Sequence, residues 1–252
     1  MPQPLNKVVP NATVSLTPDA LTDKPDMAVV VTQIFAMWAH LEQALAIILI
    51  RLIGGDQDVA LAIYSMLQTD SLRQSALLAA ARAKLPSEDN DILVAVINVA
   101  NRVATPRNQL AHWPWAVCKE RPDLLLLIDP KFFKAQELKP ARLNSPNTVG
   151  STKVFDDMIA VQQFDLATIQ TYGIADLKRS LRDIEEAHIV LSLAVKLLDA
   201  NSIVQVRRDA PDGQAARDQL LQQLNGQRLF REALAAKQID KGQTSNPPKM
   251  NG

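Results

Sequence analysis

Glycine, aromatic residues and cysteine are scarce in this sequence. Its 252 residues include 8 Gly, and aromatic residues make up 4%. All-β sandwiches and glycine-rich nucleotide-binding sheets need many tight turns or glycine contacts to phosphates, so both classes are disfavoured. The single cysteine, Cys118, excludes an intramolecular disulfide and a multi-cysteine metal site. It fits a reducing compartment, and we expect the protein to be cytoplasmic.

A long uncharged apolar run is also lacking. Residues 27–53 are the most apolar stretch, but a membrane span needs about 20 nearly uncharged residues. We therefore interpret this stretch as a core helix and expect no membrane partner. Residues 1–19 contain no apolar core of about 7–15 residues, so no secretory signal is expected. The polar positions that interrupt the apolar stretch are Gln33, His40, Glu42, Gln43 and Arg51.

The chain has no excess of charge of either sign. Its 27 Lys and Arg residues balance 27 Asp and Glu residues. This balance removes the whole-chain electrostatic argument for nucleic-acid binding, although local basic patches are compatible with it.

Apolar residues recur mainly at three- and four-residue steps, which predicts a mainly α fold. We expect an antiparallel helical bundle with a small two- or three-stranded β insert after the fourth helix. Short apolar runs around a Pro-Asp turn predict the insert. The predicted helices are 26–53, 58–68, 71–85, from 87 through 104, and 174–199, and the predicted strands are 115–119, 124–129 and 158–164.

Three regions follow from these elements. Residues 1–25 are rich in Pro, Thr and Asn without periodicity, and we expect a flexible N-terminal arm. Residues 26–199 form the predicted helical domain, with the β insert and a basic loop at about 114–164. Residues 200–252 are polar, and we expect a disordered tail with marginal helices at 213–224 and 227–236.

The basic loop is a local departure from the neutral charge. Residues 130–153 contain five basic side chains and one acidic side chain, Glu137, a balance of 5 − 1 = +4. With Phe132 and Phe133 they offer phosphate contacts and base stacking, as single-stranded nucleic-acid sites do. A solvated loop with both Phe side chains packed inward is the alternative. The predicted RNA-binding residues are Lys131, Lys134, Lys139 and Arg142, with Lys153 as the fifth basic residue.

The most specific local signal is ATPRNQLAHWPW, at residues 104–115. If the helix continues past Pro106, Asn108 and His112 extend a polar stripe of the fourth helix, and Arg107 lies on its apolar side. Glu42 lies at the edge of the apolar stripe of the first helix. A lone charge on an apolar face is costly to bury, so we hypothesise that Glu42 and Arg107 form an ion pair.

The same segment resembles the HEPN superfamily motif, in which an Arg, often followed by a polar residue, precedes a His by a short gap in a helical core. Here Arg107-Asn108 is followed by His112 after the four residues NQLA, and WAHLE on the first helix adds to the likeness. The resemblance implies a metal-independent endoribonuclease that acts as a homodimer without a cofactor. It implies that Arg107, Asn108 and His112 are catalytic residues. We add Glu42 as a supporting residue and expect no metal ligand.

The residue types suit this chemistry. RNA cleavage by the ribose 2′-hydroxyl needs a proton acceptor and donor, and the imidazole of a histidine such as His112 can serve as either. The Arg107 guanidinium offers bidentate hydrogen bonds to phosphate. Asn108 lies four residues before His112 and shares its helix face. Arg107 and His112 diverge by about 140° on a regular helix, so they cooperate more easily across a two-fold axis than within one chain.

Other interpretations stay open at this point. Arg and His near a helix C-terminus also stabilise the helix dipole and need no catalytic role. In that interpretation the chain is a non-catalytic HEPN-like module that dimerises or binds RNA, an antitoxin or another protein. A third interpretation is a subunit that recognises substrate for a separate catalytic protein. The enzymatic interpretation favours a toxin or a phage-defence component, since these are common settings of the family it resembles.

Overall fold

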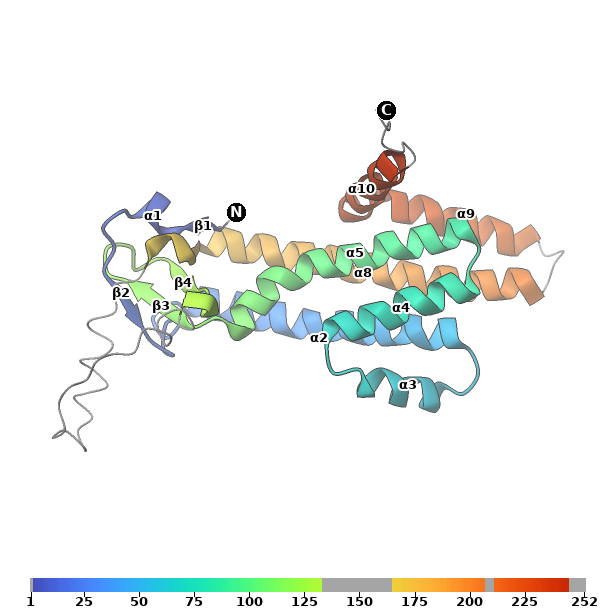
Figure 1. Ribbon diagram of the computed structural model, residues 1–252, viewed down its shortest axis with the longest axis horizontal. Coiled ribbons are helices and arrows are strands. Elements are labelled where there is room, and N and C mark those ends of the chain that lie inside the picture. Colours follow the sequence, from blue (N-terminus) through green and yellow to red (C-terminus); the bar gives the residue numbers. More distant parts are fainter. Residues whose placement is uncertain (1, 133–164, 207–210, 245–252) are drawn as a thin grey trace, which may run out of the picture. The chain divides into compact units, whose positions relative to one another are not determined.

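The computed structural model describes residues 2–132, 165–206 and 211–244, and these residues are mainly helical with a small antiparallel sheet (Figure 1). The predicted fold class is confirmed. The chain divides into two compact units, with Met1–Ile34 and Pro106–Leu181 in unit 1 and Phe35–Thr105 and Arg182–Gly252 in unit 2. The major helices are α2 (Pro25–Ile53), α3 (Gln57–Met66), α4 (Asp70–Lys84), α5 (Ser87–His112), α8 (Ile174–Val206), α9 (Pro211–Gly226) and α10 (Arg228–Thr244).

Unit 1 contains a five-stranded sheet with the order β1-β5-β4-β3-β2, in which all neighbours are antiparallel. The central strand, β4, is fully buried, and its Leu126 pairs with Thr171 on one side and with Ala116 on the other. Strands β3 and β4 confirm the insert predicted after the fourth helix, whereas the strand predicted at 158–164 lies outside the described residues. The strands are β1 (Gln3–Pro4), β2 (Val14–Leu16), β3 (Trp115–Cys118), β4 (Leu125–Ile128) and β5 (Ile169–Tyr172).

The N-terminal segment belongs to this sheet, so the prediction of a flexible arm at residues 1–25 is wrong. It supplies β1, the short helix α1 (Leu5–Val8) and β2, and β2 lies beside β3 in Figure 1. Leu5 is completely buried against the sheet. The backbone N–H and the hydroxyl of Thr13 donate to the Glu120 carboxylate at 2.9 and 2.8 Å. Strands this short carry too little periodicity to be detected in the sequence.

Unit 2 consists of helices, and local signals in the sequence set their ends. The carboxylate of Asp56 caps α3 by accepting from the backbone N–H groups of Asp58 and Val59, and the Thr69 hydroxyl caps α4. Helix α2 ends before Gly54 and Gly55, whose φ angles of 68° and 80° suit glycine. The predicted bounds of these helices differ from the observed ones by one or two residues.

Helix α2 is long enough and apolar enough to cross a membrane, judged by length and composition alone. Core helices of soluble proteins have the same property. In its most apolar window 44% of the residues are buried within the protein. The absence of a membrane partner stays a prediction.

The polar C-terminal region forms two helices, α9 and α10, where we expected a disordered tail with marginal helices. Leu224, Leu229 and Phe230 are buried almost completely. Ion pairs connect these helices to α5 and α8. Arg217 of α9 pairs with Asp89 of α5, and Arg228 of α10 pairs with Asp183 and Glu186 of α8. Sparse apolar anchors and ion pairs with distant helices therefore order a segment whose composition is polar.

Candidate functional site

Helix α5 runs from Ser87 to His112 with Pro106 inside it, so the predicted motif occupies its last turns. Arg107 and Asn108 are half-buried, and His112 is exposed. Nη1 of Arg107 donates to Oδ1 of Asn108 at 2.8 Å. This contact orients the guanidinium, and the imidazole of His112 is open to solvent. Arg107, Asn108 and His112 therefore lie on one helix end in unit 1.

Hydrogen bonds from two neighbouring strands, β3 and β5, fix the end of α5 that carries the motif. The indole N–H of Trp115 donates to the carbonyl of Leu110 at 2.9 Å, and the hydroxyl of Tyr172 donates to the side-chain oxygen of Gln109. Leu110 and Tyr172 are both 1% exposed. Burial raises the pKa of Tyr172 to about 12, so its hydroxyl stays protonated as a donor. The end of α5 is thus fixed to β3 and β5.

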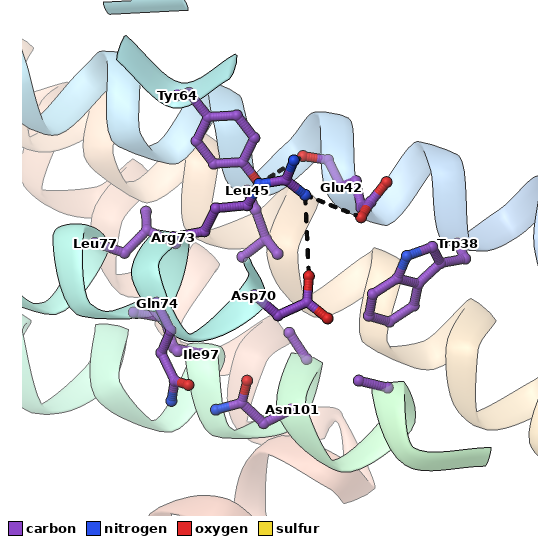
Figure 2. A pocket seen from close by; sticks show the side chains of 12 residues that line it. Trp38, Glu42, Leu45, Tyr64, Asp70, Arg73, Gln74, Leu77, Ile97 and Asn101 are labelled. Carbon is purple, nitrogen blue, oxygen red and sulfur yellow. Dashed lines mark hydrogen bonds and ion pairs between the residues drawn. The ribbon is translucent and has the colours of Figure 1, made fainter. Parts of the chain in front are cut away.

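Glu42 lies in unit 2, and its ionic partner there is Arg73 of α4, at 3.3 Å between Nη1 and Oε1 (Figure 2). Arg73 also donates from Nε to the Leu67 carbonyl at 2.8 Å, and its guanidinium carbon lies 5.1 Å from the centre of the Tyr64 ring. The pairing of Glu42 with Arg107 stays a prediction.

Arg73 is not among the site residues predicted from the sequence, although the sequence carries a signal for it. It precedes Leu77 and Ala81, both buried, at four-residue steps on α4. A charge in line with a buried stripe calls for a partner of opposite charge, which is the reasoning that singled out Glu42.

A pocket in unit 2 surrounds this ion pair (Figure 2). Side chains from α2, α3, α4 and α5 line it, among them Trp38, Glu42, Tyr64, Arg73 and Asn101. Burial raises the pKa of Tyr64 to about 12, and its hydroxyl lies 3.5 Å from the Glu42 carbonyl, to which it donates. The pocket combines apolar walls with charged groups, an arrangement typical of small-ligand sites.

Of the predicted RNA-binding residues, the structure describes Lys131. It is exposed, and its backbone N–H donates to the Asp129 carboxylate at 2.9 Å. Lys134, Lys139 and Arg142 lie outside the described residues. The RNA-binding surface therefore stays a prediction.

The remaining nucleophilic and metal-binding residue types are dispersed. His40 and His188 lie in edge contact in unit 2, with ring centres 6.1 Å apart. Cys118 is 1% exposed, and burial raises the pKa of its thiol, so it is not a reactive thiolate. Within the described ranges, no group of three or more His, Cys, Asp or Glu side chains is placed to hold a metal ion.

Comparison of the chain with protein-family models, curated proteins and solved structures finds no match. The resemblance to the HEPN superfamily therefore depends on the motif residues and on the helical context described above.

Proposed function

We propose that this protein is a metal-independent endoribonuclease that cleaves single-stranded RNA as a homodimer. The observation that carries the proposal is the arrangement of Arg107, Asn108 and His112, with an oriented guanidinium and an exposed imidazole at one helix end. A toxin or a phage-defence component, neutralised by an antitoxin or another partner, is the proposed setting.

The reaction assigns one task to each residue. The ribose 2′-oxygen attacks the adjacent phosphorus as its proton passes to a neutral imidazole of His112. The bond from phosphorus to the 5′-oxygen breaks, and that oxygen takes a proton from an imidazolium. The products are a 2′,3′-cyclic phosphate and a 5′-hydroxyl end, so neither water nor a metal ion enters this step.

Two subunits explain how one histidine per chain serves both proton transfers. His112 of one protomer acts as the base, and the same residue of its partner acts as the acid. Arg107 binds the phosphate oxygens, whose negative charge grows in the transition state. The hydrogen bond from Arg107 to Asn108 limits the motion of the guanidinium before substrate binds.

The test is the cleavage rate of a fluorescent single-stranded RNA in EDTA. We expect His112→Ala to lower the rate by about 10²–10⁴-fold, the usual contribution of general acid–base catalysis. Arg107→Ala removes the stabilisation of phosphate charge, and we expect a loss of about 10²–10³-fold. His40→Ala is the matched control, because it removes an exposed imidazole from unit 2.

Equal rates for wild type and both variants would exclude this site. Absence of cleavage on RNAs of varied sequence favours the second candidate, a non-catalytic dimerisation or partner-binding module. The observation in favour of that candidate is the same hydrogen bond, since an Arg107 side chain that orders Asn108 also stabilises the helix end.

A further inference from the structure

We propose that helix α3 is a docking surface for a partner protein, which presents an amphipathic helix with an aliphatic face flanked by Lys or Arg. The α3 surface consists of Val59, Ala62, Ile63 and Met66. This inference goes beyond the ribonuclease proposal and does not rest on it, because α3 belongs to unit 2 and the Arg107–His112 segment belongs to unit 1.

One side of α3 holds the helix against the rest of unit 2. Ala60 and Tyr64 are its buried residues. The Tyr64 hydroxyl donates to the Glu42 carbonyl of α2 at 3.5 Å, and the Arg73 guanidinium of α4 lies over the Tyr64 ring (Figure 2). Ala60 and Tyr64 are about 40° apart around a regular helix, so the buried side of α3 is narrow.

A flank of α3 next to the buried side is apolar and exposed. Val59, Ile63 and Met66 follow one another at four- and three-residue steps, so they fall within about 60° around the helix. They are 55%, 43% and 81% exposed, and Ala62 is exposed as well. Among the described residues, five of the eight large exposed apolar side chains lie between Val59 and Leu72. Single exposed apolar residues are ordinary, whereas a continuous stripe is typical of an interaction surface.

The composition of α3 supports the same conclusion. From Val59 to Met66 the helix has no charged residue, and Ser65 and the hydroxyl of Tyr64 supply its polar side-chain groups. An outer helix normally carries charged or polar residues on its solvent side, whereas a helix that is apolar all round has contacts on several sides. Helix α9 shows the usual pattern, with Gln, Asp or Asn at most of its exposed positions. The flank of α3 is therefore suited to cover by another molecule.

The charges around α3 in the sequence are all negative. Residues 54–72 contain Asp56, Asp58 and Asp70 and no Lys, Arg or His. The nearest basic residues in the sequence, Arg51 and Arg73, form ion pairs with acids of other helices. Complementary charge at an interface favours the correct partner and disfavours others. An apolar stripe with acidic neighbours therefore favours an apolar face that is flanked by Lys or Arg.

The same charges disfavour the other occupants of this surface. A second copy of the chain would bring acids against acids, and RNA or an anionic membrane would bring phosphate groups against them. The partner segment is a helix rather than a strand, because the backbone groups of α3 are bonded within the helix. Side chains at three- and four-residue steps are also the ridges and grooves through which helices pack.

Fluorescence anisotropy of a labelled peptide, titrated with the full chain, tests the proposal without depending on RNA cleavage. The probe is a peptide of about 20 residues with Leu at positions i, i+3, i+4 and i+7 and Lys elsewhere, which is long enough to form an amphipathic helix. The comparison peptide has Glu in place of every Lys. We expect saturable binding of the Leu/Lys peptide at one site per chain, and binding of the Leu/Glu peptide that is at least about tenfold weaker.

Substitutions on α3 test the apolar contact. Ile63→Gln should weaken binding of the Leu/Lys peptide by about fivefold or more, since it removes apolar area from the interface. Met66→Gln should act in the same direction, and it keeps the test valid if Ile63→Gln fails to fold, because the Met66 side chain is 81% exposed. Ile189→Gln is the matched control, because Ile189 is an exposed Ile of α8 outside the α3 surface, and it should leave binding unchanged.

A charge reversal tests the choice of a basic partner. Asp58 is exposed in the first turn of α3. Asp58→Lys should weaken binding of the Leu/Lys peptide and strengthen binding of the Leu/Glu peptide, each by about threefold or more. Glu185→Lys makes the same change of charge at an exposed position of α8 and should change both affinities less. Equal effects of the two reversals would contradict the assignment of a basic partner to α3.

Three results would overturn the proposal as a whole. They are lack of binding, equal binding of the two peptides, and binding that neither Ile63→Gln nor Met66→Gln weakens. Sedimentation velocity of the chain alone and flotation with phosphatidylcholine vesicles test the other occupants. Self-association or vesicle binding that Ile63→Gln abolishes would assign the α3 surface to a second copy or to a membrane, and it would also overturn the proposal.

Discussion

Arg73 and Glu42 illustrate how single charges behave on apolar helix faces. Their side chains are 25% and 34% exposed, between a surface pair and a buried pair. The guanidinium of Arg73 also donates from Nε to the carbonyl of Leu67, and it lies over the ring of Tyr64. The stabilisation comes from several weak contacts that converge on one side chain.

Arg73→Met is expected to lower the free energy of unfolding by about 1–2 kcal/mol. The change keeps much of the aliphatic stem of Arg73 but removes the positive charge that pairs with half-buried Glu42. The expected loss of stability lies between the values for exposed and for buried ion pairs. Urea denaturation measures the loss. Arg121→Met is the matched control, because the Arg121–Asp123 pair is 43% and 61% exposed and should change stability by less than about 0.5 kcal/mol. Equal effects of the two substitutions would contradict this account of Arg73.

At the scale of elements, the sheet depends on contacts made by the N-terminal segment. Strand β2 pairs with β3 along Val14, Ser15 and Leu16. The backbone hydrogen bond from Thr13, followed by that from its hydroxyl, lowers the pKa of Glu120 to about 2. These two bonds favour the ionised carboxylate.

The pKa of Glu120 predicts an acid-sensitive attachment of β2. A carboxyl whose pKa is lowered by folding stabilises the fold above its ordinary value of 4.5, and the stabilisation is lost as the pH falls toward about 2. We expect Glu120→Gln to speed amide hydrogen exchange in β2 at pH 7, after correction for intrinsic rates. The difference from wild type should shrink below pH 4.5, and a difference that does not depend on pH would contradict this role.

The C-terminal helices depend on a nearly buried acid. Asp89 is 8% exposed, and its two oxygens accept from Arg217 at 2.7 Å and from Asn201 at 2.9 Å. Arg217 is therefore the charge that compensates Asp89 and that joins α9 to α5.

Arg217→Met should cost about 3 kcal/mol, because it leaves the Asp89 carboxylate buried without its cation. The double variant Arg217→Met with Asp89→Leu should recover part of that loss, as the uncompensated charge is gone. Urea denaturation of the single and double variants compares the two losses. No recovery in the double variant would show that Arg217 stabilises α9 through packing alone.

At the scale of the whole molecule, the sequence predicts the long helices well, because apolar stripes, caps and the Gly54-Gly55 pair are local signals. It predicts β3 and β4 through their apolar runs and the turn between them. It misses β1 and β2, whose few residues gain order only from pairing with distant strands. It also underestimates α9 and α10, because a few buried apolar side chains and ion pairs with α5 and α8 order these helices, and no local pattern contains those long-range contacts.

The site follows the same division. The last turns of α5 carry a local motif, so Arg107, Asn108 and His112 can be proposed as site residues from the sequence alone. Arg73 is a long-range partner of Glu42, 31 positions away. Its position in line with Leu77 and Ala81 signals that it needs an acidic partner, but no local pattern in the sequence says which acid that is.

The proposed function requires that Arg107 and His112 cleave RNA through the ribose 2′-hydroxyl. The most direct measurement is analysis of the product ends after a defined single-stranded RNA is incubated in EDTA with wild type and with His112→Ala. We predict 2′,3′-cyclic phosphate and 5′-hydroxyl ends with wild type, almost none with His112→Ala, and no cleavage at a position whose ribose lacks the 2′-hydroxyl. Cleavage at 2′-deoxy positions, or equal cleavage by the variant, would contradict the claim.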